Sequence, residues 1–126
     1  MLETFVRKHR GSIYLVFRIM VGLLFMQHGA QKLFGAFGGQ PVAIFSLLGV
    51  AGIIEFFGGL LITFGLFTRI VALFGIADMI GAWFIGHVKN GWIPIVNKGE
   101  LALLYLAAFL IIFIYGQKFN NTHIRC

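Results

Sequence analysis

Charged side chains that stand within long apolar segments are the residues of this chain best suited to chemistry. A charge in the hydrocarbon region of a membrane is costly unless it is paired or reached by water, so each one marks a candidate site. Six residues are of this kind: Arg18, Lys32, Glu55, Arg69, Asp78 and Glu100. Two interpretations stay open: a structural network of ion pairs that fixes the register of the helices, or a site that binds a ligand or handles protons.

Depth in the membrane separates the candidate residues into two groups. At a rise of about 1.5 Å per residue, Arg18, Asp78 and Glu55 lie about 9, 12 and 16 Å from the inner edge, and we expect them to form an inner cluster. An outer cluster is expected at the other ends of the helices, from His28, Lys32, His87 and Glu100, with Asn90 nearby. His87 lies almost opposite Asp78 on a helical wheel, so it joins this cluster only if its helix has ended or unwound there.

Four apolar segments must position these side chains. The chain is 60% hydrophobic and 11% charged, with a mean hydropathy of +0.95, which is typical of an integral membrane protein rather than a water-soluble monomer. Breaks in the apolar pattern predict helices over 12–34, 42–65, 70–87 and 100–116. The predicted fold class is therefore all-α, an integral membrane four-helix bundle with one domain over residues 1–126. Arg18 interrupts the first apolar segment, so we expect a retained helix there and not a signal peptide.

Small residues lie on the same helical faces as the charges. At 100° per residue, Gly22 and Gly29 share a stripe with Arg18 and Lys32, and the glycines 52, 58 and 59 flank Glu55. Glycine lets membrane helices approach closely. The charges are therefore expected to face the interior of the bundle.

The charge and the cysteine content exclude other classes of protein. The formal net charge is +6, but the basic residues mostly separate apolar segments and do not form the patch or arm of a nucleic-acid-binding protein, so no nucleic acid is expected as a partner. Cys126 is the single cysteine, which excludes a disulfide framework, a CxxC redox pair and a thiolate metal site. No metal site and no intrinsic cofactor are expected.

Several motifs in order resemble those of a known family. Arg18 is followed by HGAQKLFG from His28, and Glu55 by FFGGLLITFGLFTR, which ends at Arg69. HVKNG follows from His87, and Gly99 and Glu100 open the last apolar segment. This pattern resembles the DoxX family of small four-helix membrane proteins over residues 15–116.

The resemblance implies an oxidoreductase, since members of the family are commonly described as such and relatives include the membrane subunit of a thiosulfate:quinone oxidoreductase. We therefore expect a quinone-linked subunit that works with soluble redox partner proteins in the lipid bilayer. Quinone is the expected external cofactor, because the chain has no GxGxxG or CxxC motif. The expected quinone-binding residues are Arg18, His28, Lys32, His87 and Asn90, and the expected catalytic, proton-transferring residues are Glu55, Asp78 and Glu100.

Two alternative functions stay open. The chain could be a non-catalytic scaffold or assembly factor that recruits soluble partners, which needs no chemistry from the charges. A small proton-coupled transporter is the other alternative, but Glu55 has basic residues at matching depth, whereas such a transporter needs an unpaired acid. The glycine-rich faces also allow a homodimer.

The distribution of Lys and Arg predicts the orientation in the cell inner (plasma) membrane. Most basic residues lie at the N-terminus, beside Arg69 and in the tail, while Lys32, Lys89 and Lys98 lie on the other side. By the positive-inside rule, both termini are expected in the cytoplasm.

Labelling of Cys126 tests this orientation. Because the tail is expected inside the cell, a membrane-impermeant maleimide should leave Cys126 unmodified in intact cells and modify it once the cells are opened. Modification of Cys126 in intact cells would reverse the predicted orientation.

Overall fold

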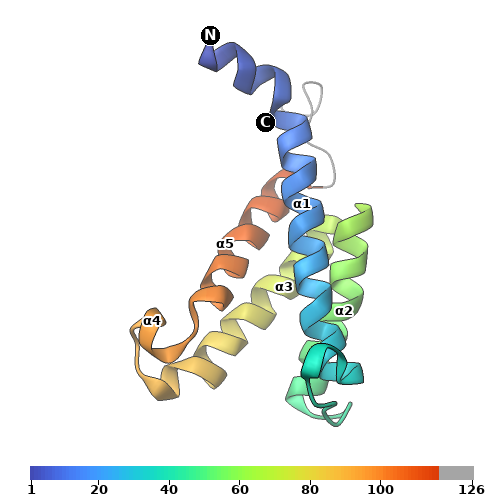
Figure 1. Ribbon diagram of the computed structural model, residues 1–126, viewed down its shortest axis with the longest axis vertical. Coiled ribbons are helices and arrows are strands. Elements are labelled where there is room, and N and C mark those ends of the chain that lie inside the picture. Colours follow the sequence, from blue (N-terminus) through green and yellow to red (C-terminus); the bar gives the residue numbers. More distant parts are fainter. Residues whose placement is uncertain (117–126) are drawn as a thin grey trace.

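A computed structural model describes residues 1–116, and the predictions for Lys118, Arg125 and Cys126 lie outside this part of the chain. Four helices form the body of the molecule (Figure 1): α1 (Leu2–Phe34), α2 (Leu47–Phe64), α3 (Thr68–Gly81) and α5 (Glu100–Tyr115). The short elements are η1 (Ala36–Gly38), the π-helical η2 (Ala82–His87), η3 (Val88–Asn90) and α4 (Pro94–Asn97). Residues 1–116 contain no strand, which confirms the predicted all-α class.

Three of the helical segments are long and apolar enough to cross a membrane. They are Leu2–Phe34, Leu47–Phe64 and Thr68–Asn90, the last of which combines α3, η2 and η3. The 16 residues of α5 make a shorter apolar helix of about 24 Å. The protein is therefore a membrane protein with four apolar helical segments.

The helices are arranged as two antiparallel pairs. In Figure 1, α1 lies beside α2, and α3 lies beside α5. The pairs meet near the turn between α2 and α3 and diverge toward the end of the molecule that carries α4. The first turns of α1 project beyond the rest of the bundle. The two helix pairs are therefore farther apart at the α4 end than at the other end.

Two helix starts differ from the sequence prediction. Helix α1 begins at Leu2 and not at residue 12, since its basic first turns continue the same helix. Helix α2 begins at Leu47, five residues later than predicted, because the Ser46 side chain caps it by accepting a hydrogen bond from the Gly49 amide at 3.0 Å. The later start shortens α2 to 18 residues, while its end at Phe64 is within one residue of the predicted end.

Glycines bring α1 and α2 into backbone contact. A Cβ atom added to Gly59 would lie 2.5 Å from the Met26 amide nitrogen and 2.6 Å from the Gly22 carbonyl oxygen. Side chains at these positions would force the helices apart, so this pair of helices depends on its small residues.

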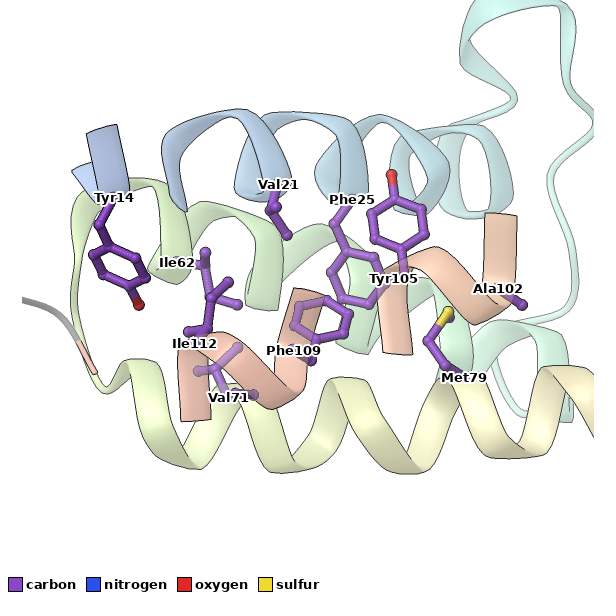
Figure 2. Packing of buried hydrophobic residues seen from close by; sticks show 11 residues of the cluster. Tyr14, Val21, Phe25, Ile62, Val71, Met79, Ala102, Tyr105, Phe109 and Ile112 are labelled. Atoms are coloured by element: carbon purple, nitrogen blue, oxygen red, sulfur yellow. The ribbon is translucent and has the colours of Figure 1, made fainter. Parts of the chain in front are cut away.

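The core lies between the two helix pairs and is mainly aromatic. Figure 2 shows side chains from α1, α2, α3 and α5 pointing into one layer. Phe25 and Phe109 are almost fully buried and meet edge to face, with ring centroids 4.7 Å apart. Gly75 makes room for this contact, because a Cβ atom there would lie 2.8 Å from the Phe109 ring.

Polar side chains hold the end of the bundle opposite α4. Arg18 donates from Nε to the Ile62 carbonyl oxygen at 3.0 Å. Arg69 donates to the carbonyl oxygens of Phe113 and Ile114 at 3.1 and 3.0 Å. These contacts satisfy carbonyl groups near the C-terminal ends of α2 and α5, where a helix favours positive charge.

Substitution of Gly59 by Ala tests the contact between α1 and α2. The added methyl group meets backbone atoms, so Gly59→Ala should destabilise the fold by about 1–3 kcal/mol. Gly81→Ala is the matched control, because a Cβ atom at Gly81 meets nothing within 4 Å. Thermal unfolding in detergent, followed by circular dichroism, should give a lower Tm for Gly59→Ala only. Equal Tm values for the two variants would contradict the proposed close contact.

Candidate functional site

An ion pair between α1 and α2 is the centre of the candidate site. Lys32 Nζ lies 2.7 Å from Glu55 Oε1. The Glu55 side chain is only 5% exposed and that of Lys32 is 26% exposed, so the protein itself shields most of the ion pair from lipid and water. Gly52 allows this geometry, since a Cβ atom there would lie 3.0 Å from Lys32 Cβ. In a membrane neither charge is stable without the other.

Asp78 of α3 extends the pair into a group from three helices. The carboxyl groups of Asp78 and Glu55 lie close enough to interact with each other and with Lys32. Two neighbouring carboxylates repel each other in a medium of low dielectric constant, and Lys32 balances only one negative charge, so the group is most stable when the two carboxyl groups share one proton. Asp78 Oδ2 is buried and has no hydrogen-bond partner in the described part of the chain.

A cavity of about 250 Å³ lies between the two helix pairs, against the ion pair. It is lined by Phe25, His28, Lys32, Glu55, Met79, Ala82, His87, Lys98, Leu101, Ala102 and Tyr105. The rings of His28 and Tyr105 meet edge to face, with centroids 5.8 Å apart. The cavity thus combines donors and a carboxylate with aromatic walls, which is the usual composition of a small-ligand site.

The π-helical segment η2 brings His87 to this cavity. The sequence predicts that His87 joins the outer cluster only if its helix ends or unwinds, and α3 does end at Gly81, before the wider turns of η2. His87 Nδ1 lies 3.1 Å from the Asn97 carbonyl oxygen, which fixes the ring. The condition for including His87 in the site is therefore met.

A second cavity, of about 430 Å³, lies on the α2 and α3 side of the ion pair. It shares four lining residues with the first cavity: Lys32, Glu55, Ala82 and His87. Asp78 lines only the second cavity. The charged group therefore borders both spaces, which adjoin each other there.

The predicted inner cluster does not form as expected. Arg18 contacts the C-terminal end of α2, where its guanidinium group also lies against Gly65, whereas Glu55 pairs with Lys32. Glu55 lies eight residues, or about 12 Å, into α2, and the long Lys32 side chain from the last turn of α1 reaches it there. The carboxylates of the expected inner cluster therefore join the outer residues.

Two other predicted site residues lie apart from the cavities. Glu100 at the start of α5 and Asn90 in η3 are both exposed and line neither cavity. The structure thus brings His28, Lys32, Glu55, Asp78 and His87 around one group, although the sequence prediction divided them between two clusters, while Arg18, Glu100 and Asn90 lie outside it.

Three polar residues near the site were missed from the sequence. Tyr105 is buried and Lys98 lines the first cavity. Asn97 is 2% exposed, donates to the Gly91 carbonyl oxygen at 2.7 Å and accepts from the Gly99 amide at 2.7 Å. The sequence could have indicated a buried Tyr105, because this residue shares a helical face with Phe109 and Ile112 on an otherwise apolar helix.

Comparisons with known proteins agree with this architecture. An "Uncharacterized protein" of Haemophilus influenzae is 38% identical over 112 residues, which cover 83% of this chain and 84% of that protein. A Bacillus subtilis protein named "Putative oxidoreductase CatD" is 30% identical over 112 residues, 83% of this chain and 80% of its own length. No solved structure matches. The sequence model of the DoxX family matches residues 13–88, more than half of the molecule, and the chain belongs to the DoxX family.

Proposed function

We propose that this chain is the membrane subunit of a quinone-linked oxidoreductase, which binds a quinone headgroup and supplies protons while soluble partner proteins supply electrons. The observation that carries the proposal is the Lys32 and Glu55 ion pair beside a cavity of about 250 Å³ between the helix pairs. Family membership and the name of the B. subtilis relative support a membrane oxidoreductase.

The walls of the first cavity suit a quinone ring. Quinone oxygens only accept hydrogen bonds, and the ammonium group of Lys32 and the hydroxyl group of Tyr105 can donate them. Phe25 and Tyr105, with ring centroids 5.3 Å apart, offer apolar faces to the ring itself. The cavity therefore offers hydrogen-bond donors to the oxygens of a quinone and aromatic side chains to its ring.

The carboxyl groups suit the proton chemistry of quinone reduction. Reduction of a quinone to a quinol takes two electrons and two protons, one for each oxygen. The proton shared by Glu55 and Asp78 can supply one of them, and the neighbouring histidines 28 and 87 can relay the other. The electrons come from a partner, since the sequence has no GxGxxG or CxxC motif.

The position of the cavity indicates where such a partner docks. Lys32 lies in the last turn of α1, His87 directly precedes η3, and Lys98 directly follows α4. We therefore expect the electron donor to dock at the α4 end and not at the first turns of α1.

Extraction of the protein from its own membrane tests whether quinone is bound. Native mass spectrometry after mild extraction should detect a co-purifying quinone, with a quinone band in the ultraviolet spectrum of the same sample. A colourless protein that carries only phospholipid would favour the scaffold function instead.

Substitution of Glu55 by Gln tests the role in proton transfer. Loss of the carboxyl group should lower quinone-linked turnover with the partner by at least about 10²-fold. Glu3→Gln is the matched control, because Glu3 is exposed in the first turn of α1, far from the cavity. Turnover by Glu3→Gln should equal that of the wild type.

A double variant separates chemistry from folding. Glu55→Gln leaves Lys32 without its counter-charge, which by itself can lower the yield of folded protein. Lys32→Gln combined with Glu55→Gln removes both charges, so the folded yield should recover while turnover stays low. Recovery of turnover together with the yield would show that the charges are only structural.

A further inference from the structure

We infer that the second cavity holds the hydrocarbon tail of the quinone whose headgroup lies in the first, so that the substrates are tailed, membrane-dissolved quinones. This inference rests on the proposed function. The cavity, of about 430 Å³, is lined at its outer part by apolar side chains of α2 and η2, including Leu47, Leu48, Val50 and Ile85.

The second cavity opens toward the lipid. Leu47 is 73% exposed and Ile85 64% exposed, and both belong to helical segments that are apolar enough to cross a membrane. A molecule dissolved in the membrane can therefore enter between α2 and η2 without crossing water.

The second cavity is continuous in its lining with the proposed headgroup site. Lys32, Glu55 and His87 form part of the wall of both spaces. A ligand that places a polar ring at this wall and extends an apolar chain past it matches the distribution of polar and apolar groups. Asp78 Oδ2, which has no partner in the described residues, stands at the polar end.

Two glycines keep this opening wide. A Cβ atom added to Gly81 or Gly86 would meet nothing within 4 Å, unlike one added to Gly59. Packing therefore does not require glycine at either position, and both residues line the second cavity. A side chain there would instead occupy the space that we assign to the tail.

The groove between α2 and α3 is a weaker candidate for the tail. It has a volume of about 390 Å³ and is lined by Phe57, Phe67 and Phe74 among other apolar residues. It shares none of the charged residues of the headgroup site. A tail in this groove would leave the headgroup away from the ion pair.

The test compares a tailed quinone with a tail-free one. Gly81→Leu and Gly86→Leu fill the opening, and Ala107→Leu adds the same kind of bulk on the exposed face of α5. Binding of decylubiquinone and of ubiquinone-0 is measured for each variant in nanodiscs, with empty nanodiscs subtracted. Because the tail must pass the blocked opening, we expect both glycine variants to lose at least about tenfold in affinity for decylubiquinone. Their affinity for ubiquinone-0 and the affinities of Ala107→Leu should match the wild type.

The outcomes distinguish the two proposals. Wild-type protein that binds neither quinone would overturn the proposed function. Wild-type binding of both quinones, with equal effects of Gly81→Leu on the two, would overturn only the tail site. A decylubiquinone analogue with a diazirine at the tail end gives an independent measure: labelling should fall on residues 47–54 and 77–86. Labelling of the apolar groove at Phe67 and Phe74 would contradict the inference.

Discussion

The ion pair between Lys32 and Glu55 is the interaction on which the α4 end of the molecule depends. In a medium of low dielectric constant, neither charge is tolerated alone, so α1 and α2 must stay in the register that keeps these groups 2.7 Å apart. The interaction of Glu55 with Asp78 adds α3 to this constraint. One group of charged side chains therefore links three helices beside the cavity.

The two ends of the bundle are built by different means. At the end opposite α4, Arg18 and Arg69 donate to helix carbonyl groups, and Tyr14 donates to the Gly116 carbonyl oxygen at 2.6 Å, so the helix pairs are held together. The aromatic core around Phe25 and Phe109 continues this contact to the middle of the bundle. Beyond the core the pairs diverge, and the space between them is lined by titratable side chains. The tightly held end thus positions the open end, where a cavity of about 250 Å³ lies against the ion pair.

Much of this architecture was predictable from the sequence, because long apolar segments and glycine-rich helix faces can be recognised from residues that are close together in the chain. The all-α class and the end of α5 near residue 116 follow from such patterns. The partner of Glu55 was not predictable in the same way, since an estimate of depth does not give the direction in which a long side chain such as that of Arg18 extends. Arg18 extends to the C-terminal end of α2, and Glu55 pairs with Lys32 instead. Tyr105 was missed because a single hydroxyl group on an apolar helix gives a weak signal until the opposite helix is placed.

The conformation of η2 gives the site a basic group that a regular helix would not provide. A continued α-helix from Asp78 would carry His87 to the far side, whereas the π-helical turns place it on the wall of both cavities. Since a carbonyl oxygen only accepts, the contact of 3.1 Å with Asn97 requires the proton of a neutral His87 ring to be on Nδ1. Nε2 is then the nitrogen that can take a proton. The loop that carries the buried Asn97 therefore fixes the tautomer of a neutral His87 and the orientation of its ring, at the wall of both cavities.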